Sequence, residues 1–246
     1  MTTKASVTLC IFEAVKFVFG NFLDCIFRVL PILFLVSLLV WAQSIFGGLV
    51  ALVFDILEPF LYAMFAVAWH RYSVLKSEQA RSGFFYGFGM RELKFGAASV
   101  LFAYLLKLTG SILVQTLPQE LALAAFILLL LPLLVTLVFI YPAIALDQPL
   151  RLRLFLNEGL KLTWSFIVAI VVVSIVIAAL TAAAYFSLKI LTTIFMPAAL
   201  KLLIFIAYNL IIIPLVLAIS TSSASFLYKA VIGLEGEETL PSNEAL

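Results

Sequence analysis

Long apolar runs fill most of the chain, and short clusters of charged and polar residues separate them. The run 121–146 is long enough for the ~20 apolar residues that cross the hydrocarbon layer of a bilayer. Backbone polar groups find no water in lipid, so such a run is predicted to form a helix that satisfies them internally. We predict six spanning helices, at about 31–54, 59–75, 95–117, 121–145, 163–187 and 202–228.

Residues 6–30 have a different, amphipathic pattern. A helix is typical of the membrane interface when its polar residues gather on one side and its apolar residues on the other. The polar side is predicted to hold Glu13, Lys16, Gly20, Asn21, Asp24 and Arg28. We divide the chain into an N-terminal interfacial amphipathic helix (1–30), a six-helix transmembrane domain (31–229) and an acidic cytoplasmic tail (230–246).

The predicted fold class is an all-α integral membrane protein in which six helices form three hairpins. The first hairpin can turn at 47–48 or at 55–59. The second choice keeps the carboxylates of Asp55 and Glu58 out of the hydrocarbon, where charge is costly. It also puts Pro59 at a helix start, where its missing N–H is tolerated. We favour the turn at 55–59.

The positions of lysine and arginine predict the orientation, because cytoplasmic loops carry an excess of both. A cytoplasmic N-terminus leaves Lys107 within a helix and Lys189 and Lys201 outside. The other cations then fall on the cytoplasmic side: Lys4, Lys16, Arg28, Arg71, Lys76, Arg81, Arg91, Lys94, Arg151, Arg153, Lys161 and Lys229. We predict a multi-pass protein of the bacterial inner membrane with both termini in the cytoplasm.

Composition agrees with a membrane protein and narrows the chemistry. The chain is 65% hydrophobic and 11% charged, whereas a soluble domain is about half apolar and about a quarter charged. A net charge of +2 is too small to predict a nucleic-acid partner. Cys10 and Cys25 would lie roughly 22 Å apart on one helix, beyond disulfide reach. Neither has metal-ligand spacing to another cysteine or to histidine, so we expect free thiols and no cofactor or metal.

Three stretches carry a resemblance to a known group. They are "AVAWHRYSVL" (66–75), "GFGMRELKFG" (87–96) and "YPAIALDQPLRLRLFLNEGLKLTWSF" (141–166). Together they resemble uncharacterised bacterial six-helix inner-membrane proteins of a YciC-like group, which includes the membrane domain fused to some glycerophosphodiester phosphodiesterases. The resemblance implies a role in envelope or lipid homeostasis. It supplies no catalytic residues, and the phosphodiesterase activity is not implied.

His70 is the only histidine in the chain and follows a long apolar run. A metal site needs several converging ligands, and His70 has no second histidine beside it. Trp69 and Tyr72 are of the type that prefers the headgroup level of a membrane. We therefore expect these residues to anchor the cytoplasmic end of the second span.

The loop 81–91 places aromatic residues among glycines beside several cations. It lacks the Gly-Lys-Ser/Thr of a phosphate-binding P-loop. It suits either general seating in the headgroup layer or a site for an anionic phospholipid headgroup, with arginine bonded to phosphate. Under the second interpretation the candidate contacts are Arg71, Arg81, Arg91 and Lys94.

Lys107 is predicted near the middle of the third span, on a face with small residues that suits a helix–helix contact. As a buried group it would need a partner such as Glu58, Gln43 or Asn209, and Lys107 with Asn209 would form an intramembrane polar site. Alternatively, the helix ends near Thr109 and Lys107 extends to the outer interface, which we favour. The hydroxyl-rich run 220–225 in the last helix is predicted to pack closely against another helix.

No serine, histidine and carboxylate are placed to converge, so we expect no enzymatic activity. The leading interpretation is a structural or accessory role in the membrane, in envelope or lipid homeostasis or as a subunit of a membrane complex. Its partners would be membrane lipids, including anionic phospholipid headgroups, and a membrane protein or a second copy of the chain. The alternative is a small transporter or channel with a polar path near Lys107 and Asn209.

Overall fold

A computed structural model describes residues 7–46, 48–75, 88–165 and 198–234. The described residues are almost entirely helical and contain no strand, which confirms the all-α class. Residues 152–165 are helical too. The main helices are α1 (Val7–Gly20), α2 (Phe22–Phe46), α3 (Gly48–Val74), α5 (Met90–Thr116), α6 (Gln119–Ala145) and α8 (Ala198–Val231).

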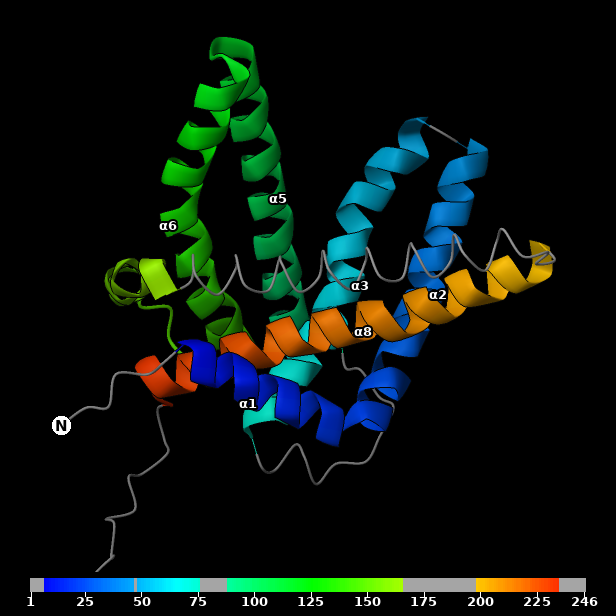
Figure 1. The fold of residues 1–246 in the computed structure, drawn as a ribbon, viewed down its shortest axis with the longest axis horizontal. Coiled ribbons are helices and arrows are strands. Elements are labelled where there is room, and N and C mark those ends of the chain that lie inside the picture. The colour runs from blue at the N-terminus through cyan, green and yellow to red at the C-terminus, as the bar shows by residue number, and fades with distance from the viewer. Residues whose placement is uncertain (1–6, 47, 76–87, 166–197, 235–246) are drawn as a thin grey trace, which may run out of the picture.

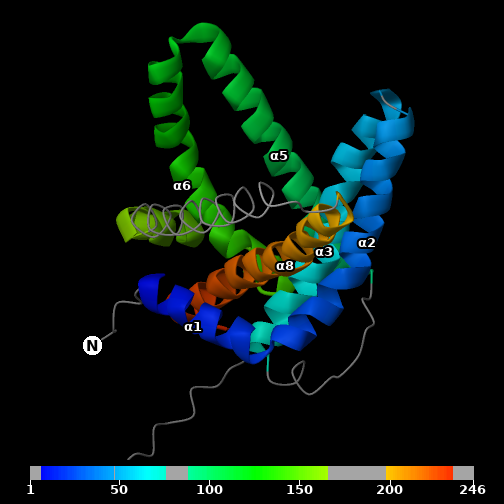
Figure 2. The ribbon, with the colours of Figure 1, turned by 45° about the vertical axis from the view of Figure 1, so that its right-hand side comes forward.

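Two helical hairpins, α2–α3 and α5–α6, point the same way from a common base (Figure 1). Figure 2 shows that they diverge toward their tips. Helices α1 and α8 run across the base, and α1 lies along the C-terminal part of α8 in both views. Helix α3 packs against α2, α5, α6 and α8 and is therefore the centre of the described fold.

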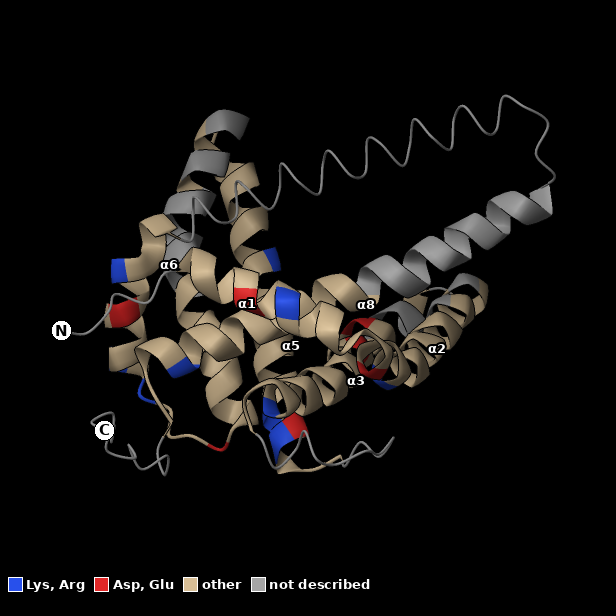
Figure 3. Cartoon of the chain, turned by 60° about the horizontal axis from the view of Figure 1, so that its bottom comes forward, with Lys and Arg blue, Asp and Glu red and all other residues tan. Residues whose placement is uncertain are grey.

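Within the described residues, helices long and apolar enough to cross a membrane are found in four places: Phe22–Gln43, Val53–Val74, Met90–Thr116 and Pro214–Val231. Figure 3 shows long stretches of these helices without a charged residue. The protein is thus suited to a membrane. The predicted fifth span continues beyond residue 165, outside the described residues, and so does most of the tail predicted over 230–246.

The first hairpin turns between Phe46 and Gly48, so the favoured turn at 55–59 is wrong. Helix α3 begins at Gly48 and continues through Asp55 and Pro59. A continuous helix keeps the backbone hydrogen bonds of the apolar run after Gly48 satisfied. The ammonium of Lys107 compensates the charge of the Asp55 carboxylate within this helix. The second hairpin turns at Leu117–Pro118 between α5 and α6, close to where the apolar pattern predicted it.

The segment expected to be one helix to residue 30 is divided at Asn21. Helix α1 ends at Gly20, and the Asn21 side chain donates a hydrogen bond to the Phe17 carbonyl at 2.8 Å. Asparagine competes for backbone bonds in this way and disfavours an uninterrupted helix. Helix α2 then runs through Pro31 without ending. The interfacial position of α1 stays a prediction.

The helices of the base enclose an aromatic core. Trp69 is fully buried between α2 and α8, and Phe17 and Phe65 have ring centroids within 6 Å of it. Gly96 of α5 allows close approach to α3, because a Cβ atom there would collide with the ring of Phe60. The hairpins meet tightly at this level, near the base.

Candidate functional site

Asp147 joins two arginines at the base of the bundle. One oxygen of its carboxylate, Oδ2, lies 3.3 Å from a guanidinium nitrogen of Arg71 and 3.3 Å from one of Arg91. Arg71 belongs to the last turn of α3 and Arg91 to the first turn of α5. Three segments that are distant in the sequence therefore meet at a single carboxylate, which we call the Asp147 cluster.

The end of α6 gives Asp147 this position. Gln148 N–H bonds to the Ala143 carbonyl at 2.8 Å, and Asp147 N–H bonds to the Ile144 carbonyl at 3.3 Å. This pair of bonds is the Schellman arrangement that ends many helices. It places Asp147 in the left-handed region at φ 55°, which asparagine and aspartate tolerate better than other side chains. The turn directs the carboxylate toward α3 and α5.

The Asp147 cluster is accessible to solvent and holds two cations for one carboxylate. The side chains of Arg71, Arg91 and Asp147 are 20%, 41% and 58% exposed. Two guanidinium groups share the one carboxylate of Asp147. Lys94 lies three residues beyond Arg91 on α5 and is exposed. Of the four predicted headgroup contacts, the structure brings Arg71 and Arg91 together at Asp147. Lys94 lies on α5, one helical turn beyond Arg91, and Arg81 lies outside the described residues.

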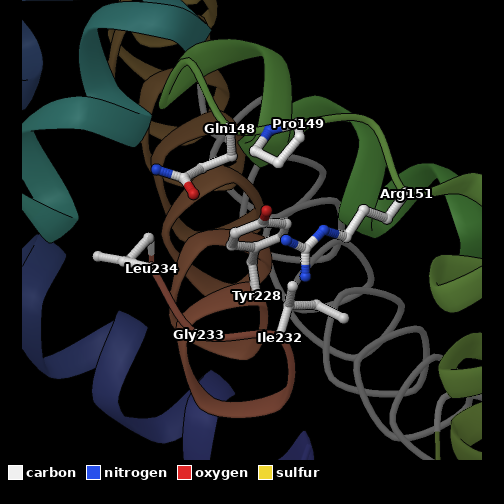
Figure 4. Close-up of a pocket in the computed structure, with 7 residues that line it drawn as sticks. All are labelled: Gln148, Pro149, Arg151, Tyr228, Ile232, Gly233 and Leu234. Carbon is white, nitrogen blue, oxygen red and sulfur yellow. The ribbon is translucent and has the colours of Figure 1, made fainter. Parts of the chain in front are cut away.

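A small pocket of about 100 Å³ lies beside the loop that follows α6 (Figure 4). No local pattern in the sequence predicts this pocket, because its walls come from the loop after α6 and from the end of α8. Figure 4 shows the Arg151 side chain reaching toward Tyr228, which is 1% exposed. The lining residues are Gln148, Pro149, Arg151, Tyr228, Ile232, Gly233 and Leu234.

Trp69 and His70 do not anchor the headgroup layer, contrary to our prediction. Their exposed fractions are 0% and 2% because α8 covers them. Trp69 Nε1 donates to Ser222 Oγ at 2.8 Å, and His70 Nδ1 lies 2.6 Å from Ser225 Oγ. The predicted packing of the hydroxyl run 220–225 is confirmed, since Ser222 and Ser225 are fully buried.

The His70–Ser225 pair does not have the arrangement of a catalytic base and nucleophile. Ser225 Oγ donates its proton to the Thr221 carbonyl at 3.0 Å. The serine oxygen must then accept the proton of His70 Nδ1, whereas a general base would accept the serine proton. Burial of both residues also denies a substrate access. We assign the pair a packing role between α3 and α8.

Tyr72 is buried as well and fastens α3 to the break between α1 and α2. Its hydroxyl lies 2.8 Å from Asp24 Oδ2 and 3.1 Å from Asn21 Oδ1. The Arg28 guanidinium carbon is 4.5 Å from the centre of the Tyr72 ring, a cation–π distance. Three polar residues of the predicted amphipathic segment, Asn21, Asp24 and Arg28, therefore contact Tyr72 of the same chain.

The position of Lys107 also differs from the one that we favoured, in which the helix ends near Thr109. Helix α5 ends at Thr116, about 14 Å beyond Lys107 along its axis. The Lys107 ammonium lies 3.2 Å from the Asp55 carboxylate of α3. Asp55 was missed as a partner because the turn of the first hairpin was misplaced. Asn209 lies within α8, and its side chain falls outside the described part of the structure.

In the described residues, no three histidine, cysteine or acidic side chains gather where they could hold a metal ion. Cys10 and Cys25 are both free thiols and both buried. Burial, with a smaller effect from the negative charge of Glu13, raises the pKa of the Cys10 thiol above its ordinary value. Cys10 is therefore a poor metal ligand or nucleophile at neutral pH.

Comparisons of the chain with protein-family models, with curated proteins and with solved structures find no match.

Proposed function

We propose that the protein is a non-enzymatic component of a bacterial inner membrane, with an accessory role in envelope or lipid homeostasis, and that it binds anionic phospholipid headgroups at the Asp147 cluster. The observation that carries this proposal is the convergence of Arg71 and Arg91, from two different helices, on the single carboxylate of Asp147.

Arginine suits this role because its planar guanidinium offers several N–H donors to phosphate oxygens. Arg91 is the more exposed arginine and lies where a headgroup can reach it. Asp147 holds both side chains in place, which lowers the entropy lost when a phosphate binds. Lys94 adds a third cation one helical turn from Arg91.

The position of the Asp147 cluster along the bundle also supports the proposal. The Asp147 cluster lies at the ends of apolar helices, where α3 ends and α5 begins. The ends of spanning helices coincide with the phosphate layer of a bilayer. The predicted topology puts this end on the cytoplasmic side, whose leaflet carries the anionic lipids that attract basic residues.

The test is lipid retention by purified protein. The protein would be exchanged into nanodiscs of mixed phosphatidylcholine and phosphatidylglycerol and extracted under mild conditions. Native mass spectrometry would then identify the lipids that stay bound. We expect the Arg71→Gln, Arg91→Gln double variant to lose phosphatidylglycerol preferentially. Lys161→Gln is the matched control, because that exposed lysine pairs with Glu158 of its own helix. Equal phosphatidylglycerol retention by the double variant and the wild type would refute the proposal.

The second candidate function is a small transporter or channel, and the Asp55–Lys107 pair favours it. Ionisable residues within apolar helices often mark a path for ions or substrates. Reconstituted wild-type protein should then dissipate a proton or potassium gradient across liposomes, and Lys107→Met should change the rate. If liposomes that contain folded protein are no more permeable to protons and potassium than empty liposomes, transport of these two ions is excluded.

A further inference from the structure

The ion pair between α5 and α3 is exposed although it lies inside the apolar hairpins. Lys107 and Asp55 are 73% and 45% exposed. Asp55 lies seven residues after the start of α3, about 10 Å along its axis. Both hairpins therefore extend well past the pair toward their tips. Val53 and Leu108, which lie close to Asp55 and Lys107 in the sequence, are apolar and exposed.

Such a pair is costly if lipid tails alone surround it. Each charge near the centre of a spanning helix costs a few kcal/mol on insertion scales. An ion pair recovers part of this cost, but the other hydrogen-bonding positions of the ammonium and the carboxylate still need partners. Acyl chains offer neither donors nor acceptors. A polar group from another protein segment would satisfy them.

The face of α5 that carries Lys107 is also shaped for a second helix. Near the base this face uses the small residue Gly96 to pack against Phe60 of α3. Farther along, α5 and α3 diverge, and the same face continues with Ala103 and Ser111, four residues before and after Lys107. Both are exposed. Small residues let helix backbones approach closely in a membrane.

We propose that a second copy of this chain packs against this face, and that Lys107 of each copy bonds to Asp55 and Glu58 of the other. Glu58 lies one helical turn after Asp55 on α3 and is partly exposed. The face thus carries a cation and two carboxylates, so it complements itself in charge.

Membrane geometry supports this choice of partner. Two copies with the same orientation in a bilayer are related by a twofold axis along the bilayer normal, and such an axis keeps the depth of every residue. Lys107 and Asp55 are 3.2 Å apart and therefore lie at nearly the same depth. The rotation brings the ammonium of each copy to the level of the carboxylates of the other. A closed twofold interface has this reciprocal form. The inference does not depend on the Asp147 cluster.

Charge reversal in two differently tagged copies tests the interface. Lys107→Glu gives an all-acidic face, and Asp55→Lys gives a face with two lysines. Each variant would be co-expressed with a tagged copy of itself, extracted with its surrounding lipid, and captured through one tag. We expect capture of the second tag to fall about tenfold relative to the wild type, which corresponds to about 1.4 kcal/mol.

Co-expression of the acidic copy with the basic copy should restore capture to near the wild-type level, because opposite faces then meet. A variant that failed to fold would not be rescued in this way. Lys161→Glu is the control, because that exposed lysine pairs within its own helix, and its capture should equal that of the wild type.

Three results would overturn the inference. Wild-type copies that do not capture each other would show that the chain is monomeric, with lipid or another protein at this face. Capture that charge reversal leaves unchanged would place any dimer contact elsewhere. A mixture of acidic and basic copies that captures no better than either variant alone would exclude ion pairing between copies.

Discussion

Ser225 Oγ of α8 lies 2.6 Å from Nδ1 of His70 in α3, in a place closed to solvent. The serine also donates to the Thr221 carbonyl, so the imidazole is the donor in the contact between the helices. The lone histidine of the chain is therefore held by a specific hydrogen bond in the core.

Replacement of Ser225 by alanine tests this bond. The variant leaves the Nδ1 proton of His70 buried without its acceptor, which typically costs about 1–3 kcal/mol. We expect a clear fall in Tm in detergent. Ser220→Ala is the control, because Ser220 is exposed and bonds only to Leu217 of its own helix in the described structure. Equal melting temperatures for the two variants would count against a stabilising role for the bond.

The contact between Gly96 and Phe60 predicts a second stability effect. Gly96→Ala adds a methyl group that collides with the Phe60 ring, and overpacking of this kind typically costs about 1–3 kcal/mol. Gly96→Ala combined with Phe60→Leu should recover part of the loss, which thermal unfolding of all three proteins would measure. Gly48→Ala is the matched control, because a Cβ atom there meets nothing within 4 Å. Additive losses in the double variant would contradict the contact.

Hydrophobic length alone predicted part of the fold. The expected helices 95–117 and 121–145 correspond to Met90–Thr116 and Gln119–Ala145. Their apolar runs are long, and a polar stretch ends each one. The turn of the first hairpin was predicted in the wrong place because an unpaired charge is the one that hydrocarbon disfavours strongly. Asp55 is not unpaired, since Lys107 is its partner.

The candidate site was only partly predictable for a related reason. Arg71 and Arg91 were identified by their place near helix ends, but nothing local in the sequence indicates that Asp147 joins them. Trp69 and His70 were misread because their partners Ser222 and Ser225 lie 153 and 155 residues away. An aromatic residue at a helix end suits both the headgroup layer and a protein core, and only tertiary packing decides between them.

The raised pKa of Cys10 predicts slow thiol chemistry. A higher pKa leaves less thiolate at neutral pH, and burial also limits access. In a Cys25→Ala variant, we expect maleimide labelling of the native protein at pH 7 to be slow and to accelerate as pH rises toward and above the ordinary thiol value. Denaturation in SDS should make labelling fast at pH 7. Fast labelling of the native protein at pH 7 would show that Cys10 is not buried.

The orientation predicted from lysine and arginine is open to a direct test. A reporter enzyme that is active only in the periplasm would be fused after Leu246, and we expect it to stay inactive. A reporter active only in the cytoplasm, fused at the same residue, is the control for expression. Periplasmic activity would reverse the orientation and would move the Asp147 cluster to the leaflet that faces the periplasm.

Substitutions at Asp147 separate its backbone role from its charge. The left-handed conformation at φ 55° costs about 1–2 kcal/mol for an ordinary side chain and little for glycine. The exposed ion pairs contribute only about 0–1 kcal/mol. We therefore expect Asp147→Gly to be nearly as stable as the wild type, Asp147→Asn slightly less stable, and Asp147→Ala the least stable.

Lipid retention should follow a different order, because all three variants release Arg71 and Arg91 from the carboxylate and raise the local positive charge. Asp147→Asn should then retain more phosphatidylglycerol than the wild type in the native mass spectrum. Less retention by Asp147→Asn, with its Tm unchanged, would mean that holding the two arginines in place contributes more to headgroup binding than the added positive charge.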